Sequence, residues 1–445
     1  MLRKHIAAAI IISLTFSIPV SAQQDSIWTL EECIQFALDQ NIQVRKSENS
    51  TSRSQLYYDQ SKAQRFPSVN GSANQNFGWS RNSTSGVSGY SFATGSGYSV
   101  SSGVTLYNGS RLSNQIKQSQ LDIRSSEYQL ETTKEGISLN ILDAFLQVLY
   151  SEEQVKNSNK QIESTEEQLR LAGERLNLKV ISVADYSQVR SQLANEKLTL
   201  ANSEKQYAIA RVTLMQLMEL PSVNNFEIAH PDMDTLLFGK RIPDVWKVYE
   251  TALTIKPQIK SASLNKEIAG LDEKIARAGY FPSLTASAGI STGFSSEANG
   301  AYSNQLNDGL YPTAGLSLSI PIYQKKQVKT TVEVAKLSYS DAELTELDTR
   351  NQLRKNIEQA CLDVTSAQVE YEASIENFQA TLESTSLAEE KFIQGLINSV
   401  DYLVSKTNLI YAESKLLQSK YNLIFSYKVL DFYEGVPLSF QTIKK

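Results

Sequence analysis

Two runs of alternating polar and small or apolar residues, between Phe281 and Ile322, constrain the fold of this chain more than any other feature. A period of two over about ten residues is typical of a β-strand with one apolar and one polar face. About 9–11 residues is also the length that a tilted strand needs to cross a bilayer. The runs flank a segment rich in Gly, Asn and Ser, so they predict a hairpin of a transmembrane barrel with its apolar face toward lipid. A hairpin of a soluble β-sandwich is the alternative at this point.

The residues expected to face lipid share one side of a predicted strand. They are Leu284, Ala286 and Ile290 in the first run, Leu316, Leu318 and Ile320 in the second, and Val100, Val104 and Leu106 in a strand nearer the N-terminus. Phe77, Trp79 and Tyr98 in the N-terminal pair of strands suit an aromatic girdle at a membrane interface. Between those two strands, Arg81–Gly97 is rich in Ser, Gly and Thr and is expected to form an exposed loop.

The whole arrangement occurs twice, with a period of roughly 215 residues. Four landmarks return in the same order: Ala37–Val44 as Ala252–Ile259, Arg65–Val69 as Tyr280–Leu284, Val183–Tyr186 as Ser399–Tyr402, and Leu220–Pro221 as Val436–Pro437. This period is too long for a solenoid, so we predict two copies of one large unit. Each copy is expected to contain a helix, a strand, a loop, a strand, a long helix, a break and a returning helix.

Long helical segments frame the predicted strands. The first copy predicts helices over Leu30–Gln64, from Ser110 to about Leu171, and over Tyr186–Leu220; the second repeats the long pair over Lys325–Lys391 and Val400–Glu434. At about 1.5 Å per residue, the helix from Ser110 is roughly 90 Å long. Such a length is typical of coiled coils and exceeds what a globular core needs.

The N-terminus has the pattern of a secretory signal. Arg3 and Lys4 precede the apolar run Ile6–Val20, and Val20-Ser21-Ala22 fits a signal-peptidase site. The predicted organisation is therefore a signal peptide over residues 1–22, a first repeat over 23–220, a linker over 221–241 and a second repeat over 242–445. No later segment has the eighteen or more consecutive apolar residues of a membrane helix.

Composition disfavours several classes of function. Loss of residues 1–22 removes two basic residues and no acidic one, so 41 basic and 48 acidic residues give a net charge of −7. An acidic chain disfavours nucleic acid as a partner. His230 is then the one histidine, and Cys33 and Cys361 have no ligand-type residues near them in the sequence. The mature chain therefore has too few suitable side chains for a zinc site or for Ser–His or Cys–His catalysis. We predict no enzymatic activity and no cofactor, and leave open whether the cysteines pair.

Four strands per chain have a direct physical consequence. Four strands cannot close a barrel, and an open sheet edge cannot face lipid. The chain must therefore oligomerise and share its strands, giving twelve in a trimer or eight in a dimer. The long antiparallel helices would continue this cylinder into the periplasm and form a conduit.

These residues resemble the TolC family of outer-membrane efflux proteins across essentially the whole mature chain. The resemblance rests on Trp28–Asn41, the two F-P-S-[VL] segments, Leu106–Gly109 and the two tip segments. It implies an α+β membrane protein, a homotrimer with a twelve-stranded barrel continuous with an α-helical coiled-coil barrel. It also implies a Gram-negative outer-membrane location, docking to a periplasmic adaptor (membrane fusion) protein and an inner-membrane transporter, and no chemistry of its own.

The resemblance also assigns roles at the periplasmic tips. The gate candidates are Asp185, Asp401, Gly395, Phe392, Tyr186 and Tyr402. A basic tie position of the family falls on Ile397, so the likeness does not extend to an ionic latch. Three Asp401 carboxylates around a constriction would favour cations and raise one another's pKa. The alternative role of Asp185 and Asp401 is to act as N-caps of the returning helices.

The tip loops are the candidates for adaptor docking. They consist of Asn177, Leu178, Lys179 and Val180 in the first repeat, and Leu396, Ile397 and Asn398 in the second. The alternative is that they are ordinary solvated turns. At the level of the whole chain, the competing function is a secreted or periplasmic coiled-coil structural or adhesion protein without a pore. The sequence does not separate export of small molecules from export of proteins.

Overall fold

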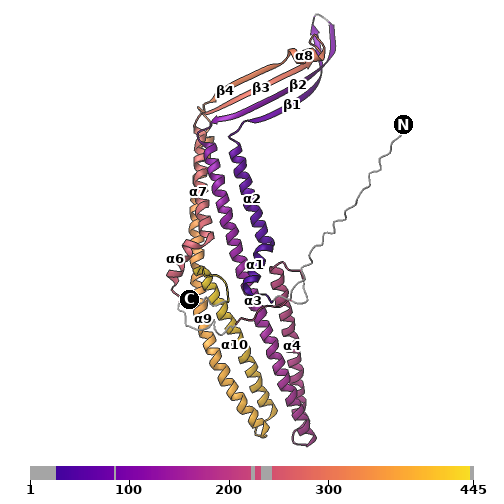
Figure 1. The fold of residues 1–445 in the computed structure, drawn as a ribbon, viewed down its shortest axis with the longest axis vertical. Helices are drawn as coiled ribbons and strands as arrows, with labels where there is room; N and C mark the ends of the chain where they lie inside the picture. The colour runs from indigo at the N-terminus through magenta and orange to yellow at the C-terminus, as the bar shows by residue number, and fades with distance from the viewer. Residues whose placement is uncertain (1–26, 85–86, 222–225, 232–242, 441–445) are drawn as a thin grey trace, which may run out of the picture.

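A computed structural model of the chain describes residues 27–84, 87–221, 226–231 and 243–440. The molecule is long, with a sheet at one end and two helical hairpins at the other, and long helices joining them (Figure 1). The predicted signal peptide, residues 1–22, lies outside the described residues, as does most of the predicted linker 221–241.

The first half of the chain supplies four helices and two strands. In order these are α1 (Leu30–Gln40), α2 (Ile42–Ala63), β1 (Ser68–Thr84), β2 (Val87–Tyr107), α3 (Arg111–Asn177) and α4 (Val183–Leu217). With 67 residues, α3 is about 100 Å long at about 1.5 Å per residue. It therefore runs from the sheet to the far tip of the molecule.

The second half repeats this order. It contains α6 (Val245–Ile255), α7 (Pro257–Arg277), a short 3-10 turn (Ala278–Tyr280), β3 (Ser283–Ser295), α8 (Tyr302–Asp308), β4 (Tyr311–Ser319), α9 (Gln327–Ile393) and α10 (Ser399–Glu434). Like α3, α9 has 67 residues. Apart from the 3-10 turn and α8, the described parts of the two halves present the same elements in the same order.

The passage from strand to long helix has the same unusual backbone in both halves. Gly109 and Ser110 have φ of 66° and 66°, and Lys325 and Lys326 have φ of 49° and 66°, which is the left-handed region. At Gly109, an added Cβ would stand 2.8 Å from the Cβ of Phe281 in the other half. This close approach requires glycine and explains the last residue of the Leu106–Gly109 segment.

The four strands form one antiparallel sheet in the order β1-β2-β3-β4. The helices below it pack in the matching order, α2 on α3, α3 on α7 and α7 on α9. Within the described residues, β1 and β4 each pair on one side only, so both lateral edges of the sheet are open. One chain therefore has the form of a section cut from the wall of a tube.

The expectation of an exposed loop over Arg81–Gly97 is wrong. Pairing continues to Thr84 opposite Val87, so β1 and β2 are much longer than predicted. The physical reason is that backbone hydrogen bonds between antiparallel strands form with any side chains, including Ser and Gly. Contacts between aromatic side chains on the two strands stabilise the pairing further. In the second repeat, the polar segment between the strands contains the short helix α8.

The predicted helix Leu30–Gln64 is broken at Asn41, which has an extended backbone (φ −60°, ψ 130°). The side chain of Asn41 caps α2, because its Oδ1 accepts a hydrogen bond from Gln43 N at 2.8 Å. Its Nδ2 donates to the Leu217 carbonyl at 3.0 Å and ties the break to the end of α4. The second repeat breaks at the equivalent Lys256, before Pro257 at the first position of α7.

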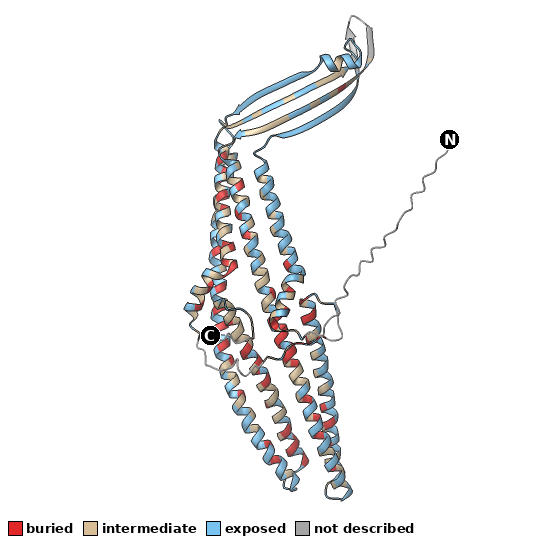
Figure 2. Ribbon diagram, viewed as in Figure 1, coloured by how far each residue is buried: buried red, intermediate tan, exposed pale blue. Residues whose placement is uncertain are grey.

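Buried side chains concentrate at mid-height, where α1 and α6 pack on the long helices (Figure 2). Phe145, Leu142 and Leu214 lie in the cluster of the first repeat, and Leu353 and Leu430 in that of the second. Elsewhere the helices are largely exposed, as expected for a single wall section.

The two cysteines are free and buried in these regions. Burial raises the pKa of the Cys33 thiol to about 12. A thiol of that pKa carries almost no nucleophilic thiolate near neutral pH.

None of the helices that the structure describes has the length and apolar character needed to cross a bilayer.

Candidate functional site: paired tips and an amphipathic sheet

The two tips share one local design. Each long helix ends in a left-handed residue, Lys179 (φ 61°) in the first repeat and Gly395 (φ 75°) in the second. The next amide then donates back to the helix, Val180 N to Arg175 O at 2.9 Å and Leu396 N to Lys391 O at 2.8 Å. This pattern ends a helix by satisfying its last carbonyls. Glycine adopts the left-handed backbone freely, whereas Lys179 does so at a cost of roughly 1 kcal/mol.

The N-caps of the returning helices are Ser182 and Asn398. Asp185 N donates to Ser182 Oγ at 3.1 Å, and Asp401 N donates to Asn398 Oδ1 at 2.8 Å. The interpretation of Asp185 and Asp401 as N-caps is therefore wrong by three residues. Both aspartates lie in the first turn, where a carboxylate is stabilised by the helix dipole.

Asp185 connects the two tips. Ser399 Oγ donates to Asp185 Oδ1 at 2.6 Å, and Ser182 Oγ donates to Asp185 Oδ2 at 2.6 Å. These hydrogen bonds lower the pKa of Asp185 below its ordinary value, those from Ser182 first and the one from Ser399 next. Asp401 is different, because its side chain is exposed. The Asp185 carboxylate therefore links the two tips, whereas the Asp401 carboxylate faces solvent.

Tyr402 and Phe392 form the apolar part of the second tip. Their rings stack with centroids 5.0 Å apart and an angle of 6° between planes. Tyr402 is only 3% exposed, and Gln168 of the first repeat donates to its hydroxyl at 2.5 Å. Burial raises the pKa of Tyr402, so its hydroxyl stays protonated near neutral pH. Tyr186, the equivalent residue of the first repeat, is half-buried.

Arg175 makes a further connection that the sequence did not reveal. Its Nη2 donates to the Ile393 carbonyl at 3.2 Å, from the first tip to the end of α9. Ile397, where the resemblance led us to expect a tie, carries no charge; the basic residue that reaches the second tip is Arg175 of the other repeat. Comparing the two tips position by position would have drawn attention to Ser399, because its equivalent is the apolar Val183.

A buried ion pair lies farther along the same helices. Lys406 in α10 and Glu196 in α4 are 6% and 4% exposed, with Nζ 3.8 Å from Glu196 Oε1. Lys406 Nζ also donates to Thr165 Oγ1 at 2.5 Å and to Gln168 Oε1 at 3.4 Å, both in α3. Desolvation by burial lowers the pKa of Lys406. This cluster joins three helices of both repeats inside the bundle.

The predicted docking loops are strongly exposed and apolar. Leu178, Val180 and Leu396 are 74%, 69% and 68% exposed. The other predicted docking residues, Asn177, Lys179, Ile397 and Asn398, lie in or beside the same two turns. Exposed apolar side chains grouped in this way are typical of a surface that contacts another protein.

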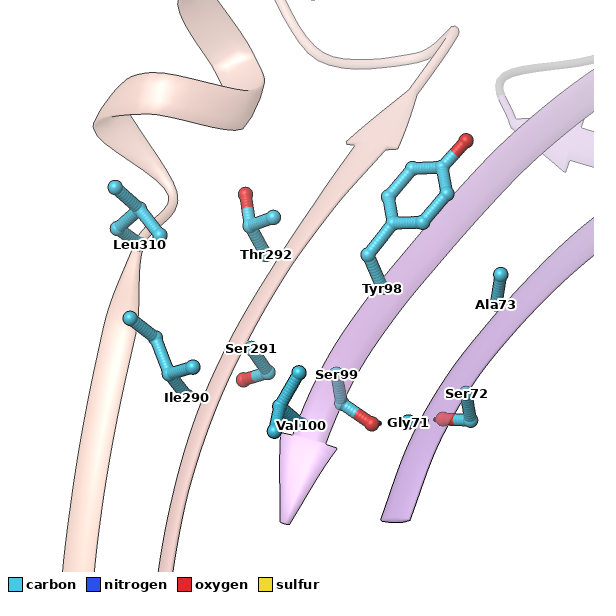
Figure 3. Close-up of a pocket in the computed structure, with 10 residues that line it drawn as sticks. All are labelled: Gly71, Ser72, Ala73, Tyr98, Ser99, Val100, Ile290, Ser291, Thr292 and Leu310. Carbon is cyan, nitrogen blue, oxygen red and sulfur yellow. Dashed lines mark hydrogen bonds between the residues drawn. The ribbon is translucent and has the colours of Figure 1, made fainter. Parts of the chain in front are cut away.

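The sheet has two chemically distinct faces. The pairs Leu284–Leu318, Ala286–Leu316 and Val104–Ala286 place predicted lipid-facing residues side by side. Tyr98, Val100, Ile290 and Thr292 lie on one face of the sheet (Figure 3) and line a shallow hollow of about 440 Å³. The hydroxyls of Ser72 and Ser99, which belong to the other face by the alternation of the strands, are hydrogen-bonded to each other.

Two of the predicted lipid-facing positions lie outside this regular pattern. Leu106 lies in an irregularity of β2, where Tyr107 pairs with Leu284 in its place. Ile320 follows the last residue of β4 and is 59% exposed. Among the residues that the structure describes, no group of His, Cys, Asp and Glu side chains could hold a metal ion.

Comparison with protein families decides the affiliation. The profile described as "Outer membrane efflux protein" matches residues 33–219 and again residues 248–435. The chain belongs to the outer membrane efflux protein family. Members of this family are trimeric transport channels and not enzymes. Membership places the chain in the outer membrane of Gram-negative bacteria, with its helices extending into the periplasm.

Individual relatives are distant. Outer membrane protein TolC of Escherichia coli is 24% identical over 310 residues, which cover 66% of this chain and 60% of TolC. The aligned part thus spans less than two thirds of that relative. The structure of CusC, described in connection with transmembrane channel formation, has a TM-score of 0.76 at 16% identity, over 92% of this chain and 95% of CusC.

The open state of the MtrE outer membrane channel of Neisseria gonorrhoeae has a TM-score of 0.74 at 17% identity, over 99% of this chain and 100% of MtrE. At such identities the likeness shows the fold. That fold combines long helices with four antiparallel strands per chain.

Proposed function

We propose that three copies of this chain form an outer-membrane channel that continues as a helical tube through the periplasm. The observation that carries this proposal is the matching lateral order of strands β1-β2-β3-β4 and helices α2-α3-α7-α9, both with open edges. Because backbone groups at an open edge cannot face lipid unpaired, β1 of one copy must pair with β4 of the next. The sheet and the tube then close together.

The proposed role is export. The channel serves as the exit duct of a tripartite efflux or type I secretion system and releases small molecules or proteins at the cell surface. Energy comes from an inner-membrane transporter, and a periplasmic adaptor joins that transporter to the tube. We propose that the adaptor contacts the exposed apolar side chains of the two tip turns, Leu178, Val180 and Leu396.

We further propose that the periplasmic end closes at the tips. Opening requires the α9–α10 hairpin to separate from the α3–α4 hairpin. The contacts of Lys406 with Thr165 and Glu196 oppose that movement, and so do three connections nearer the tips. They are the hydrogen bonds Ser399–Asp185 and Arg175–Ile393 and the hydrogen bond from Gln168 to Tyr402, itself stacked on Phe392. In this proposal the exposed Asp401 carboxylates ring the opening and favour cations.

The division of the chain is part of the same proposal. Residues 1–22 are removed on export, residues 23–220 and 242–445 form the two repeats, and 221–241 connects them. The supporting observation is that equivalent elements occur in the same order in both halves.

A single preparation tests the channel. The mature protein is purified in detergent, its mass is measured by light scattering, and it is added to planar bilayers. A species of three chains with discrete conductance steps supports the proposal. A monomer without conductance would overturn it and favour the coiled-coil structural protein, for which the apolar face of the sheet has no use.

A further inference from the structure

The Lys406–Glu196 pair is enclosed between the two helical hairpins at the end of the molecule opposite the sheet (Figure 1). Lys406 belongs to α10 and Glu196 to α4, and α3 supplies the hydrogen bonds of Lys406 Nζ. The two residues are only 6% and 4% exposed. Separation of the α9–α10 hairpin from the α3–α4 hairpin, the movement proposed above for opening, would part the two charges and expose both to water.

The geometry of this pair compensates its burial poorly. Lys406 Nζ and Glu196 Oε1 are 3.8 Å apart, which is beyond hydrogen-bond distance. Glu196 Oε1 accepts from Gln192 Nε2 at 2.9 Å, but Glu196 Oε2 has no hydrogen-bond partner among the described residues. The attraction within a buried ion pair offsets the lost hydration only if the geometry is excellent and the remaining lone pairs are satisfied. Neither condition holds for Glu196, so closure costs hydration that the pair does not recover.

Packing does not require a charge at this place in the bundle. The offset that relates Asp185 to Asp401 makes Ala412 the equivalent of Glu196 in the second repeat. Ala412 is only 1% exposed. The second repeat therefore buries a small apolar side chain where the first repeat buries a carboxylate. The ion pair is thus a feature of this contact between hairpins and not of the repeat.

We propose that the buried Lys406–Glu196 pair makes the tip bistable and favours the fully open tube over the closed one, an inference that rests on the tip movement of the proposed function. The contacts of Lys406 oppose the first part of that movement, because they lengthen before water fits between the hairpins. Once the gap exceeds the diameter of a water molecule, about 2.8 Å, both ions recover their hydration and the open state is stabilised. Intermediate positions, with the charges parted but dry, are the least stable.

Replacing both charged residues tests this assignment. Single-channel recording in planar bilayers compares the unmodified trimer with the double variant Lys406→Met and Glu196→Met. Methionine fills the space but gains no hydration on opening, so the ratio of open to closed tips is expected to fall at least about fivefold for each chain, which corresponds to about 1 kcal/mol. Lys406→Met alone leaves Glu196 buried without its cation in the closed state, so it is expected to raise the ratio. A pair that merely held the tip closed would instead give a rise in both variants.

A neighbouring exposed ion pair provides the matched control. Lys197 Nζ in α4 lies 2.9 Å from Glu166 Oε1 in α3, and the two side chains are 55% and 53% exposed. The double variant Lys197→Met and Glu166→Met removes the same two charges at the next position of α4. Because this pair is already hydrated and lies within one hairpin, opening changes its surroundings little. The ratio of open to closed tips should therefore remain close to that of the unmodified channel.

An unchanged or higher ratio in the buried double variant would overturn the proposal, and so would an equal fall in the exposed one. If the methionine pair fails to give heat-resistant trimers, the double variant Lys406→Gln and Glu196→Gln takes its place. It removes both charges but keeps polar groups that can hydrogen-bond, and a fall in the ratio is again expected. Discrete conductance steps from the unmodified protein report separately on the channel, so failure of this inference is distinguishable from failure of the proposed function.

Discussion

Replacing Ser399 by Ala removes one of the hydrogen bonds between the two tips, the one to Asp185, and little else. Ser399 Oγ donates to a carboxylate at 2.6 Å, and Ser399 itself is 3% exposed. Hydrogen bonds to charged groups contribute about 1.5–3 kcal/mol, and we take about 1–1.5 kcal/mol because Asp185 is near solvent. If opening breaks this bond, the ratio of open to closed tips should rise about five- to twelvefold for each chain in Ser399→Ala, and the three chains of a channel should multiply the effect if they open together.

Single-channel recording in planar bilayers measures that ratio directly. Ser182→Ala is the matched control, because Ser182 also donates to Asp185 at 2.6 Å but belongs to the same tip. Its loss weakens the start of α4 without separating the hairpins, so gating should change little. A double-mutant cycle between Ser399→Ala and Asp185→Ala should give a coupling of about 1 kcal/mol. Zero coupling, or an equal effect of Ser182→Ala, would refute the reasoning.

The same contact predicts a pH dependence with a definite sign. The pKa of Asp185 is lowered in the folded protein, so its ionised form stabilises the connection above the ordinary pKa of 3.8. That contribution is lost as the pH falls through the lowered value. Open probability should therefore be flat between about pH 8 and 5 and rise only below about 3.8. A rise already near pH 6 would show that another group controls the tip.

Three further substitutions test separate parts of the structure. Leu318→Lys should impair membrane insertion by about 2–4 kcal/mol, seen as loss of heat-resistant trimers on gels, whereas Ser317→Lys on the opposite face should insert; the reverse result would invert the facing of the sheet. Lys406→Met leaves Glu196 buried without its cation and should lower the free energy of unfolding by about 3–5 kcal/mol, whereas adding Glu196→Met should restore most of it; equal stability of single and double variants would count against the ion pair. Asp401→Ala should weaken cation selectivity and block by multivalent cations, and unchanged selectivity would remove Asp401 from the opening.

The long elements were predictable because their patterns are long. A period of two identified the paired strands, and uninterrupted helical periodicity identified α3 and α9 to within a few residues of their ends. The break at Asn41 was missed because its cause is tertiary: the amide bonds the end of α4, far along the chain. The length of the β1–β2 hairpin was missed for another reason, since Ser- and Gly-rich sequence allows either a loop or a ladder.

At the tips too, the sequence predicted some features and not others. Gly395 was identifiable because only glycine adopts a left-handed backbone without strain, yet Lys179 takes the same backbone with no sequence signal. The hydrogen bonds of Ser399 and Arg175 join residues that are 214 and 218 positions apart in the chain. Local pattern carries no information on such pairs. Only the internal duplication, which aligns the residues of one tip with those of the other, could have pointed to these two contacts.

The open lateral edges of the sheet and of the helical layer determine what stability means for this protein. Within the described residues, a single chain buries most of its core at mid-height and leaves both lateral edges of its sheet without partners. Its folding free energy is therefore inseparable from association, and its melting temperature should rise with protein concentration. Before three chains associate, the unpaired edges of β1 and β4 can form backbone hydrogen bonds with any other exposed strand. Aggregation should therefore compete with assembly in the interval between export and membrane insertion.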